Sequence, residues 1–191
     1  MNMYIFNLIN GLAHKNMILD KIMIIFSKYV PIAFMAVLAG VYILGIIKKD
    51  IRIRCIAVDI FALTAINLLI SFSIGLVYYV NRPFVHNKVN LLYSHVADAS
   101  FPSDHAIGTM SIALGINNWF KVCGRILIAL SCIVSFSRVY VGHHFPIDVI
   151  GGIVIAAFVN YLYKILVKDK IAMFYETIEG KLLKILYPNM A

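Results

Sequence analysis

Residues 137–148, Ser-Arg-Val-Tyr-Val-Gly-His-His-Phe-Pro-Ile-Asp, carry the side chains of this chain that are best suited to nucleophilic and acid–base chemistry. Pro146 cannot lie inside a helix but fits its first position, where no N–H is needed. We therefore predict a helix that begins near Phe145, with Asp148 in its first turn and His144 just outside it. A carboxylate bonded to one imidazole nitrogen fixes the tautomer and leaves the other nitrogen free to attack. The spacing predicts that Asp148 orients His144 as a nucleophile.

Arg138 adds a permanent cation to the same stretch. Its planar guanidinium suits phosphate oxygens, which it can bind through two parallel hydrogen bonds. The alternative interpretation is a polar loop whose charged residues cap the helices on either side. This segment alone does not decide between the two, so the rest of the chain must.

The composition is that of an integral membrane protein. Of 191 residues, 62% are hydrophobic and 14% are charged, and the mean hydropathy is +0.88, whereas a soluble domain has about 25% charged residues. We interpret the formal net charge of +8 as a membrane-topology signal and not as a nucleic-acid-binding surface. Cys55, Cys123 and Cys132 show neither a metal-binding spacing nor a disulfide framework, so we interpret them as packing residues.

Five apolar runs approach the length of about 20 residues that a helix needs to cross a membrane. They predict an all-α, integral membrane helical bundle in a single domain, residues 1–191, with residues 30–168 as its catalytic part. Arg82-Pro83 is expected to close the second run, because the residue before a proline is pushed out of the helical region. The runs are Tyr29–Ile47, Ile60–Asn81, Pro102–Phe120, Ile126–Gly142 and Pro146–Tyr163.

The two ends of the chain predict amphipathic helices. Residues 4–13 and 17–29 are too short to span, so we expect residues 1–29 to lie in the membrane interface. A terminal helix pair packed on the bundle is the alternative. The tail, residues 169–191, has apolar residues spaced at helical intervals against lysines, which predicts an amphipathic helix on the membrane surface.

Lysine and arginine are distributed unevenly. Segments 48–54 and 121–125 and the tail from residue 164 hold 11 of the 17, and the positive-inside rule places such segments in the cytoplasm. Loops 81–102 and 138–148 then face outward. The uncharged cores of the last three runs are only 12 to 15 residues long, which puts their polar outer ends near headgroup depth. A site at this depth suits a substrate whose polar head is anchored by a lipid tail.

Three polar clusters therefore share the outer face. Pro102 in the first turn of a helix leaves free N–H groups and a positive helix end facing outward, which favours a phosphate. Ser103 can add a hydroxyl donor, and His105 can donate a proton. Taken singly, the simpler interpretations are a helix cap for Ser103, a satisfied polar residue for His105 and an interfacial side chain for Arg82. The clusters are Arg82-Pro83, Pro102-Ser103-Asp104-His105 and residues 137–148.

The order Arg-Pro, Pro-Ser-x-His and Ser-Arg-x5-His-x3-Asp resembles the three-part signature of the type-2 phosphatidic-acid phosphatase and vanadium haloperoxidase superfamily. Within it, Asp-Ala-Ser-Phe-Pro-Ser-Asp-His at 98–105 and Gly-His-His-Phe-Pro-Ile-Asp at 142–148 are similar to undecaprenyl-diphosphatases of the bacitracin-resistance type. The signature covers residues 82–148, and the span layout fits nearly the whole chain. The hydrophobicity of the chain excludes a haloperoxidase.

The resemblance implies a role for each matching residue. His144 would form a phosphohistidine, Asp148 would orient it, and His105 would protonate the leaving group. No metal and no cofactor are expected, because arginines and a helix end stabilise the charge instead. The residues that hold the phosphate would be Arg82, Ser103 and Arg138.

The chain departs from the family pattern at two positions. The superfamily has a lysine seven residues before the Arg-Pro arginine, where this chain has Gly75; Lys88 could compensate from the loop, or it could be a plain solvated lysine. At Asp104 the superfamily usually has glycine, and a carboxylate beside a phosphate is unfavourable unless it points away or is paired. The remaining accessory candidates are His95, Asp98 and His143.

The expected function is removal of the terminal phosphate of undecaprenyl diphosphate at the outer face of the plasma membrane, which recycles the cell-wall lipid carrier and counters bacitracin. One alternative is a broader phospholipid phosphate phosphatase, acting on phosphatidic acid or phosphatidylglycerol phosphate. The other is a lipid-binding or transport protein, which predicts ionisable residues at mid-membrane, whereas here only Asp59 lies away from the outer edge, near the inner end. The expected partners are a polyprenyl diphosphate and membrane lipids, with a homo-oligomer as an open option and without nucleic acid.

Overall fold

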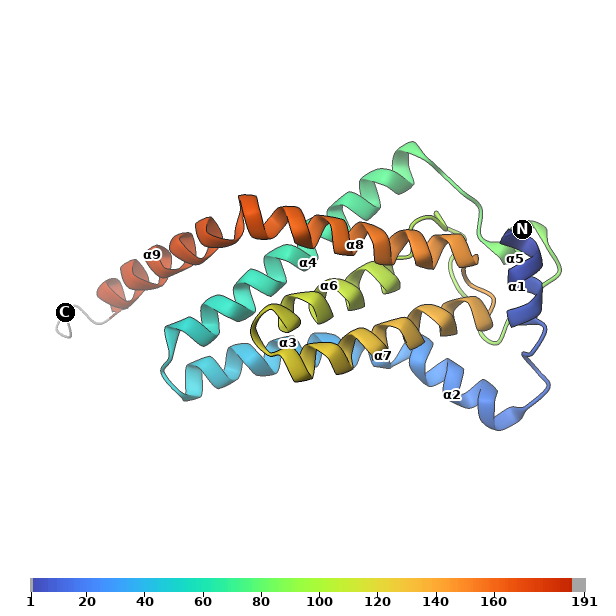
Figure 1. The fold of residues 1–191 in the computed structure, drawn as a ribbon, viewed down its shortest axis with the longest axis horizontal. Helices are drawn as coiled ribbons and strands as arrows, with labels where there is room; N and C mark the ends of the chain where they lie inside the picture. The colour runs from blue at the N-terminus through green and yellow to red at the C-terminus, as the bar shows by residue number, and fades with distance from the viewer. Residues whose placement is uncertain (1, 187–191) are drawn as a thin grey trace.

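The structure, a computed structural model, describes residues 2–186, and for residues 168, 169 and 182–186 it describes the backbone only. Residues 187–191 of the predicted tail lie outside this range. The described chain is all-α, as predicted (Figure 1). Its helices are α1 (Asn2–Asn10), α2 (Met17–Lys28), α3 (Val30–Ile47), α4 (Ile51–Val77), α5 (Pro83–His86), α6 (Asp104–Trp119), α7 (Lys121–Tyr140), α8 (Pro146–Leu166) and α9 (Lys168–Leu186).

Helix α6 is the central element of an elongated bundle and contacts α3, α4, α7 and α8 (Figure 1). Glycines let its neighbours approach closely. A Cβ atom added to Gly115 of α6 would come within 2.9 Å of Ile60 on α4, and one added to Gly152 of α8 within 3.1 Å of Ala106 on α6. Because helices on several sides cover α6, most of its length is buried.

Within residues 2–186, four helices are long and apolar enough to cross a membrane: α3, α4, α7 and α8, with 18, 27, 20 and 21 residues. Helix α6, which corresponds to the third predicted run, has 16 residues, so the predicted count of five full spans is not confirmed. Apart from α4, the predicted runs match their helices to within a few residues. The largest difference is the start of α7, which lies at Lys121 instead of Ile126.

Helix α4 differs from its predicted extent at both ends. It begins at Ile51, nine residues early, because the Asp50 carboxylate caps it by accepting a hydrogen bond from the Arg52 N–H at 2.9 Å. It ends at Val77, so the prediction that Arg82-Pro83 closes this helix was wrong. Arg82 lies in extended backbone at the start of the short helix α5. This arginine therefore reaches the site from a loop.

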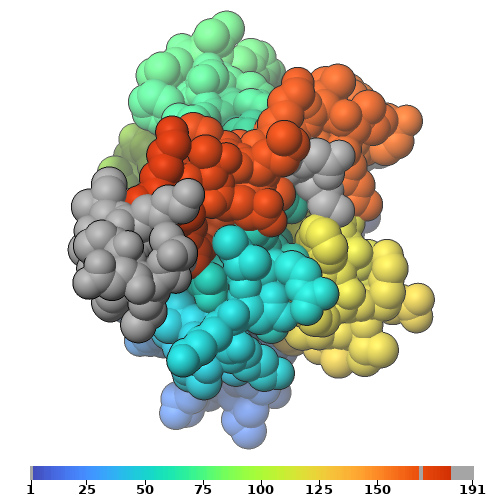
Figure 2. Space-filling view, turned by 90° about the vertical axis from the view of Figure 1, so that its left-hand side faces the viewer, coloured from blue at the N-terminus to red at the C-terminus, as the bar shows by residue number. Residues whose placement is uncertain are grey.

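The two ends of the bundle differ in charge. One end, called the basic end below, holds the α3–α4 turn, the α6–α7 turn and α9 (Figure 2). The other end, called the histidine end, holds loops 78–103 and 141–145 together with α1 and α5 (Figure 1). The basic segments and the histidine loops, which the sequence assigned to different faces, thus lie at opposite ends of the long axis.

The N-terminal helices are packed on the bundle, which was the alternative to an interfacial location. Helix α1 contacts α7 and α8, and α2 contacts α7 and α3. Phe6 is fully buried, and the Asn10 side chain donates hydrogen bonds to the carbonyls of Asn90 and Tyr140, each at 2.9 Å. Apolar side chains on the opposite face, such as Tyr4, stay exposed. Residues 2–28 therefore tie loop 78–103 to the end of α7.

Helix α9 is tied to the basic end by side chains. The Arg54 guanidinium of α4 donates to the Gly45 carbonyl at 2.9 Å and forms an ion pair with Glu179 of α9. Met173 and Phe174 remain exposed on α9. The predicted location of this tail on the membrane surface is not confirmed.

Candidate active site

The α7–α8 loop carries the histidines, and its geometry follows from two local features. Gly142 has a φ of +90°, a left-handed conformation that glycine adopts without strain, and it turns the chain after α7. Phe145 precedes the first residue of α8, Pro146, and its N–H donates to the Asp148 carboxylate at 2.8 Å. The predicted helix start and the place of Asp148 in its first turn are confirmed. Both features hold His144 rigidly at the bundle end.

His144 is buried and held in one tautomer. Its Nδ1 lies 2.9 Å from the Ser100 carbonyl oxygen, and since a carbonyl only accepts, Nδ1 is the protonated nitrogen. The Nε2 lone pair then faces the Arg82 Nη1, which donates to it at 2.8 Å. Burial lowers the pKa of the His144 imidazole well below its ordinary value, and the charges of Arg82 and Arg138 lower it further. The ring is therefore neutral and nucleophilic at Nε2.

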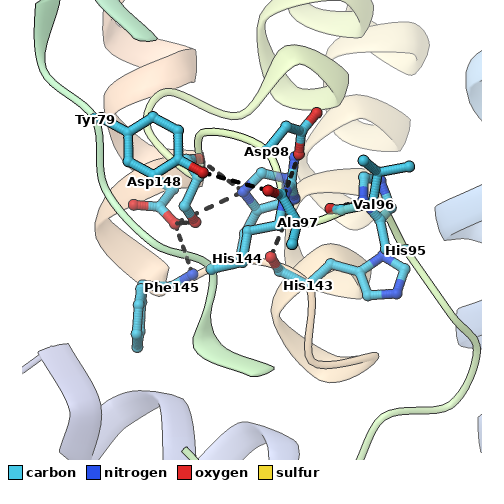
Figure 3. A network of polar contacts seen from close by, with 11 residues as sticks. Tyr79, His95, Val96, Ala97, Asp98, His143, His144, Phe145 and Asp148 are labelled. Atoms are coloured by element: carbon cyan, nitrogen blue, oxygen red, sulfur yellow. Dashed lines mark hydrogen bonds and ion pairs between the residues drawn. The ribbon is translucent and has the colours of Figure 1, made fainter. Parts of the chain in front are cut away.

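Asp148 does not hold His144 by the direct hydrogen bond that the sequence predicted. Its carboxylate oxygen lies 3.6 Å from Nδ1, which is an ion-pair distance and too long for a hydrogen bond. The same oxygen accepts a hydrogen bond from the Ser100 hydroxyl, while the Ser100 carbonyl binds the imidazole. Ser100 thus connects the two groups, and the negative charge of Asp148 lies beside the ring (Figure 3). Sequence reasoning missed this serine, although it quoted the motif that contains it.

Arg82 is anchored from the loop side. Its Nε donates to the Asp98 carboxylate at 2.6 Å, and its Nη1 also donates to the His143 carbonyl at 3.2 Å. The Arg82 side chain is buried, while that of Asp98 is 56% exposed. Tyr79 holds this loop through a hydrogen bond from its hydroxyl to the Ala97 carbonyl at 3.3 Å (Figure 3). Asp98, an accessory candidate in the sequence, is therefore the ion-pair partner of Arg82.

Arg138 is almost completely buried, and only one of its nitrogens is used by the protein. Its Nη1 donates to the Ser27 and Tyr93 hydroxyls, each at 2.9 Å. Its Nε and Nη2 have no hydrogen-bond partner within the described chain. Two buried donors of this guanidinium thus have no partner in the described chain. Ser27 lies on α2, 111 residues from Arg138, and no sequence pattern linked them.

Ser103 adds a further buried donor without a partner. It precedes the first residue of α6, but its hydroxyl makes no cap hydrogen bond and contacts no polar atom of the described chain. The simple helix-cap interpretation is therefore not supported. Helix α6 begins at Asp104, so Pro102 lies before the helix. The prediction that Pro102 lies in the first turn of this helix was wrong. The arginine donors and this hydroxyl together suit a tetrahedral anion.

His105 lies in the first turn of α6. Its ring makes no hydrogen bond within the described chain, and it borders a groove between α3, α4 and α6. It lies close enough to His144 for the two imidazoles to influence each other electrostatically. A half-buried imidazole without a fixed partner can move a proton to or from a ligand.

The departures from the family pattern have a structural explanation. The Asp104 carboxylate accepts a hydrogen bond from the Ser71 hydroxyl of α4 at 2.5 Å, so it is paired away from the phosphate-binding groups. A Cβ atom on Gly75 would come within 3.2 Å of the Ala99 Cβ, so loop 78–103 packs directly on this position of α4. Lys88 is exposed and makes no hydrogen bond or ion pair within the described chain.

His143 and His95, the two remaining histidines among the site candidates, support the loops. His143 Nε2 donates to the Tyr93 carbonyl at 2.9 Å, and the His95 ring packs edge-on against His143 with 4.6 Å between centroids (Figure 3). Burial, with a smaller effect of the charge of Arg138, lowers the pKa of His143 to about 3. His143 is therefore neutral, and it joins the α7–α8 loop to loop 78–103.

The chain is similar to known proteins over most of its length. The PAP2 superfamily model matches residues 56–172. Undecaprenyl-diphosphatase BcrC of Bacillus subtilis is 35% identical over 190 residues, which is 96% of each chain, and undecaprenyl-diphosphatase of Sulfolobus acidocaldarius is 38% identical over 110 residues, 51% of this chain and 52% of that one. The crystal structure of Aquifex aeolicus LpxE has a TM-score of 0.67 at 25% identity and covers 84% of this chain and 93% of that one. Helices α1, α2 and α3 precede the segment matched by the superfamily.

The contact between Ser27 and Arg138 predicts a measurable effect on anion binding. Ser27→Ala removes an acceptor that fixes the guanidinium, so the inhibition constant for orthovanadate, a phosphate mimic, should rise about tenfold, as expected for a hydrogen bond to a charged group. Ser27→Thr should restore most of the affinity. Ser111→Ala is the matched control, because Ser111 is equally buried but bonds only the Ile107 carbonyl of its own helix. Equal inhibition constants for the two alanine variants would show that α2 does not position Arg138.

Proposed function

The chain belongs to the PAP2 superfamily, as its three motifs predicted, and is a multi-pass membrane phosphatase of lipid phosphates; we propose that it hydrolyses undecaprenyl diphosphate to undecaprenyl phosphate and inorganic phosphate. The proposal includes a phosphohistidine intermediate and a site that faces the outside of the plasma membrane. The substrate is proposed from the names of relatives, one of which aligns over nearly the whole chain. In a cell this reaction would recycle the lipid carrier of cell-wall synthesis.

One observation carries the proposed mechanism. Buried hydrogen-bond donors without protein partners, on Arg138 and Ser103, lie in the same site as the neutral Nε2 of His144. Unpartnered buried donors are costly, and charged ones most of all. A phosphate oxygen satisfies them and brings phosphorus to the nucleophile. The site thus combines an anion-binding group with a nucleophile, which phosphoryl transfer requires.

The residues support a two-step reaction. In the first step His144 Nε2 attacks the terminal phosphorus, and the Arg82 N–H that now bonds Nε2 turns to a phosphate oxygen. The N–P bond forms as the bridging P–O bond breaks, its electron pair stays on the departing lipid phosphate, and His105 can supply a proton there. The charge of Asp148, 3.6 Å from Nδ1, stabilises the imidazolium character of the intermediate.

In the second step a water molecule attacks the phosphohistidine. An O–P bond forms and the N–P bond breaks, so inorganic phosphate leaves and His144 returns to its neutral form. His105 accepts the proton of the water, since the group that gave a proton in the first step can take one in the second. The two buried guanidiniums, Arg82 and Arg138, stabilise the charge on the equatorial oxygens in both steps without a metal.

The chemistry of the leaving group favours a diphosphate. Lipid phosphate has a second pKa of about 6, so it departs nearly unassisted at neutral pH. Cleavage of a phosphate monoester releases an alkoxide. The conjugate acid of an alkoxide has a pKa close to that of bulk water, which is about 15.7. The ring of His105 has no carboxylate partner to hold it protonated within the described chain. A reaction that needs little protonation is the better match.

The predicted catalytic roles are tested by phosphate release from undecaprenyl diphosphate by the purified protein in detergent. His144→Ala should lower turnover by at least about 10³-fold, since the attacking atom is lost. His86→Ala is the matched control, because His86 lies exposed on α5 and its side chain makes no hydrogen bond or ion pair within the described chain. Wild-type turnover should be unchanged in excess EDTA. Turnover that survives in His144→Ala, or that needs a divalent ion, would contradict the mechanism, and a preference for phosphatidic acid would contradict the substrate.

The proposed orientation follows from the charge of the two ends. The basic end, with Lys48, Lys49 and the segments around them, would face the cytoplasm, and the histidine end would face outward. In a background without the three native cysteines, Lys88→Cys should react with an impermeant thiol reagent on intact cells, and Lys49→Cys should react only after the cells are opened. Both positions are exposed in the structure. The reverse pattern would place the site in the cytoplasm.

A further inference from the structure

The proposed reaction restricts where the lipid tail can lie. In a displacement at phosphorus, the nucleophile and the leaving oxygen are roughly in line on opposite sides. His144 provides the nucleophile, and the undecaprenyl chain is attached to the leaving phosphate. His105 is the proton donor to that phosphate, so the chain must leave the site past His105. This step rests on the proposed function.

A groove begins at His105 and leads away from the site. It has a volume of about 190 Å³ and lies between α3, α4 and α6. Pro31 and Met35 of α3 line it on one side and Leu68 of α4 on the other. Gly108 of α6 keeps it open, since a Cβ atom there would meet only the Leu68 side chain, at 3.8 Å.

A second cavity continues this groove along the α3–α4 seam. It has a volume of about 330 Å³ and shares Met35 with the first. Its lining continues along α3 to Ala39 and Tyr42, and along α4 to Phe61. These residues follow at steps of three or four on two antiparallel helices, so they extend one face. From Pro31 to Tyr42 the rise is about 17 Å at 1.5 Å per residue, roughly half of the ~30 Å hydrocarbon layer.

The chemistry of the seam suits a hydrocarbon chain. Ala39, Met35 and Phe61 are apolar and exposed on the bundle surface, so a chain lying there would touch protein on one side and lipid on the other. The other cavity at the histidine end, about 260 Å³ beside Gly75, is bordered by Asp98 and Asp104. Asp104 also borders the groove at His105, but the residues that line the deeper cavity of the seam are all uncharged, whereas Asp98, the ion-pair partner of Arg82, borders the cavity beside Gly75. The seam is therefore the better site for the chain.

We propose that the polyprenyl chain of the substrate runs from His105 along the α3–α4 seam toward the basic end, and that α3 thereby selects for long chains. Helix α3 lies outside the segment that the PAP2 superfamily model matches, so this selection is a property added to the catalytic unit. A prenyl chain of several isoprene units reaches the part of the seam lined by Ala39 and Phe61, which a single isoprene unit is too short to reach. A diphosphate with one isoprene unit fills the groove next to His105 and ends there.

The test compares two prenyl diphosphates that differ only in chain length, with five and fifty-five carbons, at limiting concentration in the same detergent. Ala39→Phe places a ring in the deep part of the seam, far from the reacting atoms. It should lower the ratio of long-chain to short-chain kcat/KM about tenfold, because displacing even two methylenes from an apolar surface is worth that factor. Ala33→Phe is the matched control, since Ala33 is exposed on another face of α3 and lines neither cavity. It should leave the ratio unchanged.

The outcomes separate this inference from the proposed function. A wild-type enzyme that cleaves neither diphosphate would overturn the function, and with it the inference. A wild type that cleaves both, with the same chain-length ratio in Ala39→Phe and Ala33→Phe, would overturn the seam alone. If the wild type shows no preference for the longer chain, the proposed selection by α3 is also contradicted. Thermal unfolding of both variants in detergent shows whether each is folded as the wild type is.

Discussion

Two buried guanidinium groups in one site are the constraint on which this structure depends. Arg82 and Arg138 are 4% and 1% exposed, and burying a cation is costly unless it is paired. Arg82 has a carboxylate partner in Asp98, whereas Arg138 bonds only neutral oxygens of Ser27 and Tyr93. In the proposed function, a phosphate dianion balances both charges when it binds, which would offset this cost. Stability and function are therefore set by the same groups.

The irregular parts of the fold can be understood as the supports of these cations. Loop 78–103 contains one short helix, yet its side chains and carbonyls hold both arginines and the nucleophile: Asp98 binds Arg82, Tyr93 binds Arg138, and Ser100 binds His144. Helices α1 and α2 pack against α7 beside the site. Both helices precede the segment that the superfamily model matches. The seam between α3 and α4 leads from the site into the apolar layer. The proposals thus assign phosphate binding, chemistry and lipid selection to different parts of one small bundle.

The sequence predicted the parts of this arrangement that depend on local rules. Proline at the start of α8 placed Asp148 in the first turn, and the three motifs identified the family. Several predictions from local rules were wrong. Helix α4 begins early because Asp50 caps it and ends before Arg82-Pro83, and Asp148 hydrogen-bonds Ser100 while the same oxygen stays 3.6 Å from the imidazole Nδ1. The contact between Ser27 and Arg138 joins residues far apart in the chain, and no spacing rule could identify it. The hydrogen bond between Asp104 and Ser71 likewise depends on the packing of α4 against α6.

The central claim is that His144 becomes covalently phosphorylated, and trapping that species tests it most directly. Wild-type protein mixed with undecaprenyl diphosphate labelled in the terminal phosphate, quenched rapidly in denaturant and digested, should carry an acid-labile label on the peptide that contains His144. The label should be absent from His144→Ala and present in His105→Ala, in which the attacking nitrogen is intact. A label that persists in His144→Ala, or that maps to another residue, would contradict the account.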